Sequence, residues 1–369
     1  MKKELNINEI IQRSKAFINK EQMEKPLFGI SRIGSDIHLN RYKNLANDLP
    51  TNGQIFPKMM TKKAFLKDID KLAYEKEEVG GDLFFPAVPF NGFPWMEAIA
   101  GCPIFISANV LWAAPIKQDW KQLEQSKFIE KNEWLKKLLE LKAALIEHAK
   151  GKFPIGTTTM MRGPGDMMGA VLGQEKLIMS LYDNLDNIRK IATKYTDIWI
   201  EVALAQHRID SIFRGGYLQG GWVGLWMPRK CQYLQDDALA YFSPKFYKEI
   251  LMPCHRRMSS ITSYSFFHLH PSSLYVIDLL IQLDNIDIIE VHRELYGPSI
   301  KEMLPVLKKI QDRKALFITW CYNATSKINM KEEIKLVLKE LPFKGLCLDF
   351  MAKDIEEGRY LLSLVNKQC

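Results

Sequence analysis

Two apolar runs inside segment 263–295 end in histidines, and the second also ends in a glutamate. The segment reads SYSFFHLHPSSLYVIDLLIQLDNIDIIEVHREL. His268 and His270 end the first run, and Glu290 and His292 end the second. Residues two apart in an extended strand point to the same side, so each pair should share one face. Imidazole and carboxylate groups bind zinc and serve as general acids and bases. The segment therefore predicts a metal site or an acid–base site.

Structural roles for the same side chains remain open alternatives. His268 would then bond to a backbone carbonyl, and His270 would cap a helix that begins at Pro271. Glu290 would form an ion pair with Arg293 or with a lysine.

Strand-type apolar runs alternate with helix-type patterns along the chain. The predicted strands are residues 27–31, 82–86, 153–159, 216–222, 264–269, 286–291, 315–320 and 345–350. Eight strands, each followed by a helix, indicate an α/β fold of the (β/α)8 TIM-barrel type, whose sites lie at the C-terminal ends of the strands. A doubly wound open sheet is the alternative, but no Gly-rich phosphate loop follows the first strand.

The chain reads as one domain with two additions. Residues 1–25 are expected to form an N-terminal capping helix, and residues 26–369 the barrel. Residues 90–120, rich in proline, glycine and aromatic side chains, predict an elaborated loop after the second strand that forms one wall of the cavity.

The amino-acid composition is that of a globular protein and argues against binding of nucleic acid and against a membrane span. Of 369 residues, 47% are hydrophobic and 25% charged, as in globular proteins, and the net charge is +8. The lysines are spread along the chain, which argues against nucleic acid as a partner, and the apolar stretch 96–116 is interrupted by Glu97 and two prolines, which argues against a membrane span. The start lacks the pattern of a secretory signal, and the cysteines form no CxxC pair, so we expect a reduced cytoplasmic protein.

Four segments together resemble the uroporphyrinogen decarboxylase superfamily, which also contains the corrinoid-dependent methyltransferases. They are the Arg162-Gly-Pro-Gly-Asp166 loop, the D…SPKFYKEILMP stretch of residues 236–253, the FHLH block of residues 267–291, and Gly345-Leu-Cys347 with the helix after it. The resemblance covers roughly residues 150–369, and it implies a single barrel domain.

The chain departs from genuine uroporphyrinogen decarboxylases at two places. Their arginine-rich segment after the first strand is replaced by ISRIGSDIHLNRY, which keeps only Arg32 and the distant Arg41. Their F-S-D-I motif after the second strand is replaced by Phe85-Pro-Ala-Val-Pro89, which lacks the aspartate that would stabilise a protonated intermediate. These departures favour the methyltransferase branch.

The methyltransferase branch is expected to bind zinc through H-x-C after the fifth strand and a second cysteine near the eighth. Here His268-x-His270 stands at the first place, and Cys347 lies in the last strand, so the resemblance implies a zinc set of His268, His270 and Cys347. Cys321, at the end of the seventh predicted strand, is an alternative ligand. The metal would hold an acceptor and lower its pKa.

Further candidates surround this set. Arg162 is placed to clamp an anionic group or to hold its own loop. Of Asp236 and Asp237, one is expected to face the cavity while the other caps a helix or is solvated. Catalytic candidates are Glu290, His292, Arg162 and Asp236, and substrate-binding candidates are Arg32, Glu97, Trp222 and Cys321.

The predicted function is a cobalamin- or corrinoid-dependent methyltransferase with a zinc-activated acceptor, which implies a small corrinoid protein as partner. Glu290 and His292 would orient or deprotonate, and Arg162 would anchor an anionic group. One alternative is a decarboxylase of an acidic cyclic substrate, with Arg32 and Arg162 as carboxylate clamps and Asp236 as a stabilising group. A second alternative is a non-catalytic corrinoid- or porphyrin-binding protein. Neither the methyl donor and acceptor nor the oligomeric state follows from the sequence.

Overall fold

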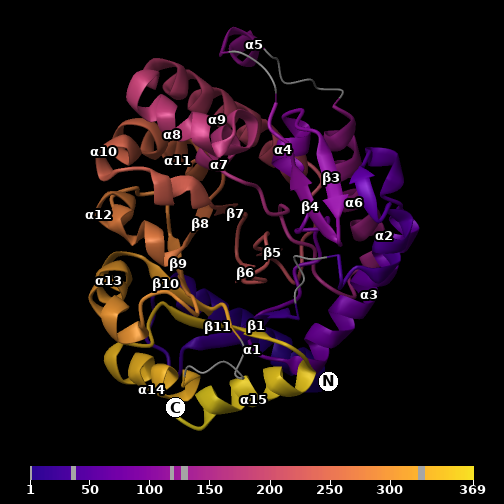
Figure 1. The fold of residues 1–369 in the computed structure, drawn as a ribbon. Coiled ribbons are helices and arrows are strands. Elements are labelled where there is room, and N and C mark those ends of the chain that lie inside the picture. The colour runs from indigo at the N-terminus through magenta and orange to yellow at the C-terminus, as the bar shows by residue number, and fades with distance from the viewer. Residues whose placement is uncertain (1, 35–38, 117–119, 126–131, 323–328) are drawn as a thin grey trace.

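A curved parallel sheet forms the centre of the protein. The computed structural model describes residues 2–34, 39–116, 120–125, 132–322 and 329–369. Six strands pair in the order β1-β11-β10-β9-β8-β7. They are β1 (Leu27–Ile33), β7 (Cys231–Leu234), β8 (Tyr264–Leu269), β9 (Ile288–Arg293), β10 (Ala315–Trp320) and β11 (Leu346–Ala352). Figure 1 shows the sheet curving around the centre with helices on its outer side.

The predicted eight-stranded barrel is confirmed in part, as a curled parallel sheet of six strands. The fifth to eighth predicted strands correspond to β8 to β11. Residues 82–86 and 153–159 form no ladder, and this part of the chain is joined by isolated bridges such as Ala87–Ile155 and Arg162–Gln235. Pro86 and Pro154 supply a physical reason, because proline has no N–H to donate to a neighbouring strand.

The prediction for the fourth strand, residues 216–222, is wrong. Within that stretch the structure has only β5 (Tyr217–Leu218), which pairs antiparallel with β6 (Trp226–Met227). Gly221 and Gly224 turn the chain between them, with φ of 69° and 70°, values that favour glycine. The strand that pairs with β8 is instead β7, the next segment along the chain.

The helices alternate with the strands and bury their apolar faces against the sheet. Thr61 caps α3 through its side chain, and Asp354 caps α15 in the same way. Ser299 and Glu302 form a reciprocal capping box at the start of α13. The helices are α1 (Lys2–Ile18), α2 (Lys43–Asp48), α3 (Lys62–Val79), α4 (Trp95–Ile99), α5 (Trp120–Gln125), α6 (Glu133–Ala149), α7 (Pro164–Leu172), α8 (Gln174–Asp183), α9 (Leu185–His207), α10 (Pro244–Phe246), α11 (Met252–Ser259), α12 (Ile277–Leu280), α13 (Ile300–Arg313), α14 (Met330–Glu340) and α15 (Ile355–Asn366).

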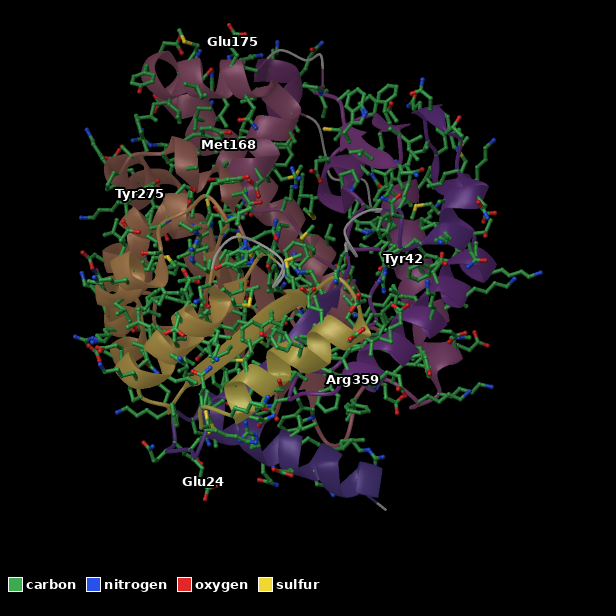
Figure 2. The ribbon with its side chains drawn as sticks, turned by 60° about the horizontal axis from the view of Figure 1, so that its bottom comes forward. Glu24, Tyr42, Met168, Glu175, Tyr275 and Arg359 are labelled. Carbon is green, nitrogen blue, oxygen red and sulfur yellow. The ribbon has the colours of Figure 1, made fainter. Side chains whose placement is uncertain are left out.

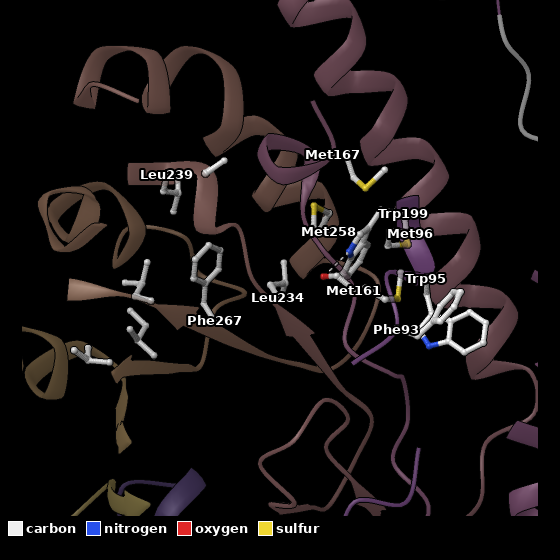
Figure 3. Close-up of a cluster of buried hydrophobic side chains, with 14 of the residues drawn as sticks. Phe93, Trp95, Met96, Met161, Met167, Trp199, Leu234, Leu239, Met258 and Phe267 are labelled. Carbon is white, nitrogen blue, oxygen red and sulfur yellow. Dashed lines mark hydrogen bonds between the residues drawn. The ribbon is translucent and has the colours of Figure 1, made fainter. Parts of the chain in front are cut away.

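Apolar side chains fill two layers. The larger core lies between the sheet and its helices, and Figure 3 shows one part of it, where Trp95 and Met96 of α4 approach Trp199 of α9. A second core lies inside the curve of the sheet, where Phe17 of α1 and Met23 pack with Phe266 and Phe317. Figure 2 shows the indigo helix α1 at the bottom of the view and the yellow helix α15, which bears Arg359, above it. The polar site must therefore lie beyond this apolar filling, towards the C-terminal ends of the strands.

The predicted insert after the second strand has its own structure. It contains α4 and the strands β3 (Ile104–Ser107) and β4 (Val110–Ala113), which pair antiparallel with each other. β3 also pairs antiparallel with β2 (Asn52–Gln54). Residues 117–119 of the insert lie outside the described residues. No helix in the described part of the chain combines the length and apolarity needed to cross a membrane.

Candidate metal centre

Two neighbouring strands deliver the histidines to one place. His268 is the penultimate residue of β8 and pairs in register with Glu290 of β9. Because side chains alternate along a strand, His270 follows His268 on the same side, and His292 and Glu294 follow Glu290. The sequence patterns H-x-H and E-x-H-x-E thus meet at the C-terminal edge of the sheet.

Two carboxylates orient two of the imidazoles. Nδ1 of His268 lies 2.7 Å from Glu290 Oε2, and Nδ1 of His270 bonds to Glu294 Oε1. The Nε2 atoms of the two histidines face each other at 3.2 Å. A carboxylate on Nδ1 fixes the tautomer that leaves Nε2 as the metal ligand, an arrangement common around protein-bound metals.

His292 completes a cluster of three imidazoles. One ring nitrogen from each of His268, His270 and His292 can be chosen so that all lie within 4.8 Å of one another. His268 and His292 are 2% and 4% exposed, whereas His270 is about half-buried, so the cluster opens to solvent on the side of His270. Three imidazoles converging on one point are a ligand set that suits zinc and similar divalent metals.

A third carboxylate, Asp237, stands beside the cluster. Its Oδ1 lies 3.3 Å from His270 Nε2 and 3.9 Å from His268 Nε2. Burial acts to raise its pKa, but the neighbouring histidines outweigh burial and lower the pKa to about 2. The same contacts, together with Glu294, overcome burial at His270 and raise the pKa of that imidazole to about 10.

Glu290 is a fully buried carboxylate that contacts both His268 and His292. Its Oε1 lies 3.3 Å from His292 Nε2 and accepts a 2.5 Å hydrogen bond from the Thr319 hydroxyl. Burial acts to raise the pKa of Glu290, yet His268 and His292 hold it well below the usual range. Burial, with the charge of His268, lowers the pKa of His292 to about 3. The predicted ion pair of Glu290 with Arg293 does not form, because Arg293 pairs with Glu333 at 2.8 Å.

A hydrogen-bonded chain runs from Glu290 across the sheet to β1. Thr319 also lies 3.2 Å from Asp349 Oδ2, and Asp349 accepts bonds from the backbone N–H and the hydroxyl of Ser31 at 2.8 and 2.6 Å. Burial raises the pKa of Asp349 to about 7, although Ser31 and Arg32 oppose that rise. Asp349 is therefore a carboxyl group that can hold a proton near neutral pH.

Arg32 lies buried in the same region. Its guanidinium carbon lies 4.5 Å from the ring centre of Trp222, and the residue is only 3% exposed. Its Nε and Nη2 have no hydrogen-bond partner among the described residues. A buried, unpaired guanidinium is unfavourable unless an anion joins it, so Arg32 marks a place for an anionic group.

Neither of the two predicted cysteine ligands belongs to the group of side chains that could share a metal. Cys347 is fully buried in the apolar core inside the sheet, and the strand register places Phe317 of β10 beside it. Three strand steps separate Cys347 from His268, which is about 14 Å along a sheet. Cys321 follows β10, and its Sγ faces the carbonyl oxygen of Thr319 at 3.6 Å. Burial raises the thiol pKa of Cys347 well above the usual range and that of Cys321 to about 12.

Asp236 holds the start of helix α7. Its carboxylate oxygens accept bonds from the backbone N–H groups of Gly165 and Asp166 at 2.9 and 2.8 Å, and Nε2 of His255 lies 3.1 Å away. A Cβ at Gly165 would lie 2.4 Å from Asp236 Oδ1, so the close approach requires glycine. Of the two aspartates, Asp237 thus faces the histidines and Asp236 caps the helix.

Arg162 and Glu97 form a separate pair. Arg162 Nη1 lies 3.3 Å from Glu97 Oε1, and Glu97 is 2% exposed while the arginine side chain is half exposed. Both residues line a cavity beneath the insert. The structure therefore divides the predicted site residues between the histidine cluster, the Arg32 region and this cavity.

Glu294, Thr319 and Asp349 belong to the site although they were not predicted from the sequence. Glu294 continues the two-residue spacing of Glu290 and His292, so that signal was present in the sequence. Thr319 and Asp349 join the site only through the order and register of β9, β10 and β11.

No family model and no curated protein sequence matches the chain. A methyltransferase from Methanosarcina mazei is similar in structure, with a TM-score of 0.63 and 15% sequence identity. The similarity covers 97% of this chain and 98% of that chain. At this identity the likeness concerns the fold, which the two proteins share over their whole length.

Proposed function

We propose that the protein is a metal-dependent methyltransferase that transfers a methyl group between a corrinoid and an acceptor held at His268, His270 and His292. The observation that carries the proposal is the convergence of the three imidazoles to within 4.8 Å. The fold shared with a methyltransferase supports the class of reaction. We further infer that residues 81–87 and 155–162, joined by isolated bridges, complete a (β/α)8 barrel of the uroporphyrinogen decarboxylase type.

The donor set fits zinc. The ligand atoms would be three imidazole nitrogens, with Glu290 and Glu294 orienting two of the rings from behind, and Asp237 is a nearby oxygen donor. His292 takes the place that the sequence analysis gave to Cys347. When bound, such a metal lowers the pKa of a coordinated thiol, so that the thiolate is available at neutral pH.

The chain's own groups would bind and orient the acceptor. Arg32, stacked on Trp222, would hold an anionic group of the substrate, since its Nε and Nη2 have no hydrogen-bond partner among the described residues. In the reaction the acceptor thiol would release its proton to water, and a sulfur–carbon bond would form to the methyl group. The cobalt–carbon bond breaks, and its electron pair stays on cobalt as cob(I)alamin. A small corrinoid protein would present the cobalt at this edge of the sheet.

Metal analysis combined with turnover tests the proposal. We expect stoichiometric zinc in the purified full-length chain, a large loss of zinc in His268→Ala and His292→Ala, and no loss in His148→Ala. His148 is a suitable control because it lies on α6, bonded to Asp70. Methylcob(III)alamin and a thiol should yield the absorbance of cob(I)alamin with the native chain and with His148→Ala, and not with His268→Ala or His292→Ala. Equal, low zinc in all four proteins would contradict the metal site.

Decarboxylation of an acidic cyclic substrate is the second candidate. It is favoured by Asp349, whose pKa burial raises to about 7, because this carboxyl could protonate a product carbon near the unpaired Arg32. Release of carbon dioxide from a carboxylated porphyrinogen, without formation of cob(I)alamin, would establish it. Binding of cobalamin or a porphyrin without either reaction would instead indicate a non-catalytic binding protein.

A further inference from the structure

A cavity of about 130 Å³ lies between the insert, residues 90–120, and the extended segment of residues 155–162. Its lining includes Phe90, Phe93 and Trp95 from the insert, together with Glu97 and Arg162. Figure 3 shows Phe93 and Trp95 lying together at the edge of the main core. Since an apolar cavity of roughly 150 Å³ accepts benzene, this cavity suits a ligand of similar small size.

Glu97 lines the cavity and has one carboxylate oxygen that accepts no hydrogen bond from the described residues. The residue is 2% exposed, and its Oε1 pairs with Arg162 at 3.3 Å. Its Oε2 is buried and has no hydrogen-bond partner among the described residues. A buried carboxylate oxygen without a donor is unfavourable, so this atom calls for an N–H or O–H group from a ligand.

Arg162 also lines the cavity, and its guanidinium can donate more hydrogen bonds than the contact with Glu97 uses. Its guanidinium is half exposed, and within the described parts of the chain Glu97 is its sole ion-pair partner. The guanidinium fork has five N–H groups, so the single contact leaves donors for a carboxylate. Because Glu97 and Arg162 neutralise each other, a ligand with one net charge gains little, whereas a ligand carrying both charges complements both residues.

We propose that this cavity binds a free amino acid with a small apolar side chain. The ammonium group donates to Glu97 Oε2, the carboxylate accepts from the Arg162 guanidinium, and the apolar side chain packs against Phe90 and Phe93. Neither Glu97 nor Arg162 belongs to the histidine cluster, and the site requires no metal, so the proposal is tested independently of the proposed methyl transfer.

Calorimetric titration of the full-length chain, stripped of metal by a chelator, tests the site. The probe is L-valine, with isobutylamine as the amine-only analogue and 3-methylbutanoate as the acid-only analogue. We expect L-valine to bind at least about tenfold more tightly than either analogue, because each analogue leaves one charged partner unpaired. Glu97→Gln and Arg162→Gln should each weaken L-valine by about tenfold or more, for the same reason.

Glu133→Gln and Arg189→Gln are matched controls, since both residues are solvent-accessible and lie on α6 and α9 away from the cavity lining. They should bind L-valine as the native chain does. Circular dichroism checks that each variant folds, and if Glu97→Gln does not, the half-exposed Arg162 decides the outcome. The proposal is overturned if L-alanine, L-valine, L-leucine and L-methionine all fail to bind at millimolar concentration. It is equally overturned if the analogues match L-valine or if the cavity variants bind it unchanged.

Discussion

Glu290 and His268 stand opposite each other on neighbouring parallel strands, with Glu290 Oε2 2.7 Å from His268 Nδ1. The contact is almost wholly buried, and it turns Nε2 of His268 towards His270. One register pair therefore determines which nitrogen of His268 is free to bind a metal.

The first prediction concerns this carboxylate. Glu290→Gln keeps the shape of the side chain but weakens the acceptor that orients His268, so we expect zinc affinity to fall about 10- to 100-fold. Competition with a chromophoric chelator measures the affinity, and Glu133→Gln, exposed on α6, is the control. An affinity equal to that of the native chain in a folded Glu290→Gln variant would show that Glu290 does not support the metal.

The second prediction concerns Arg32. Since its Nε and Nη2 lack partners among the described residues, Arg32→Met should raise the free energy of unfolding by about 1–3 kcal/mol while it removes binding of an anionic substrate. Urea unfolding measures the change. A loss of stability would mean that the Trp222 stack and the nearby Asp349 already compensate the charge.

The third prediction tests the close approach of Asp236 to helix α7. A Cβ at Gly165 would lie 2.4 Å from Asp236 Oδ1, an oxygen held by a backbone N–H, so Gly165→Ala should cost about 1–3 kcal/mol of unfolding free energy. At Gly297 the nearest atoms lie at 3.4 Å, so Gly297→Ala is the matched control and should change stability little. Urea unfolding of both variants decides, and equal effects would refute the steric argument.

The fourth prediction concerns a buried ion pair outside the cluster of His268, His270 and His292. Lys142 is fully buried and donates to Asp210 at 2.6 Å and to the carbonyl of Gln206 at 2.8 Å. Lys142→Met should destabilise the fold by about 3–5 kcal/mol, because Asp210 is left as a buried charge with less compensation. Lys308→Met, at an exposed pair on α13, should cost under about 1 kcal/mol in the same urea experiment.

The fifth prediction gives the pH dependence of that pair. Burial acts to raise the pKa of Asp210, but the hydrogen bond from His207 and the charge of Lys142 outweigh it, and the pKa lies below its usual 3.8. A depressed carboxyl pKa stabilises the fold above the unfolded value, and that stability disappears as the pH falls through the folded value.

We therefore expect the native chain to lose unfolding free energy between about pH 5 and pH 2, and Asp210→Asn to lose less over that interval. Asp278→Asn, at an exposed carboxylate, should follow the native chain. Parallel acid dependence of Asp210→Asn and the native chain would contradict the role of Asp210.

Strand prediction succeeded where the apolar runs were continuous and failed where prolines and glycines interrupted them. The strands β8 to β11 correspond to predicted runs of six residues. The second and third runs contain Pro86 and Pro154, which limit ladder hydrogen bonds. The fourth run contains Gly221, which turns the chain with a φ of 69°. Local composition could not reveal that β7, rather than residues 216–222, would be the strand next to β8, because this depends on the pairing of the two strands in the folded sheet.

The sequence by itself determined that His268, His270, Glu290 and His292 would share one edge, because alternation along a strand is a local property. Only the tertiary structure decided the ligand set. The register placed His292 beside the H-x-H pair and put Cys347 three strands away behind Phe317. The folded structure also decided that Asp236 caps the start of helix α7 and that Asp237 contacts His270. These outcomes depend on strand order and register, which arise from packing between segments distant in the chain.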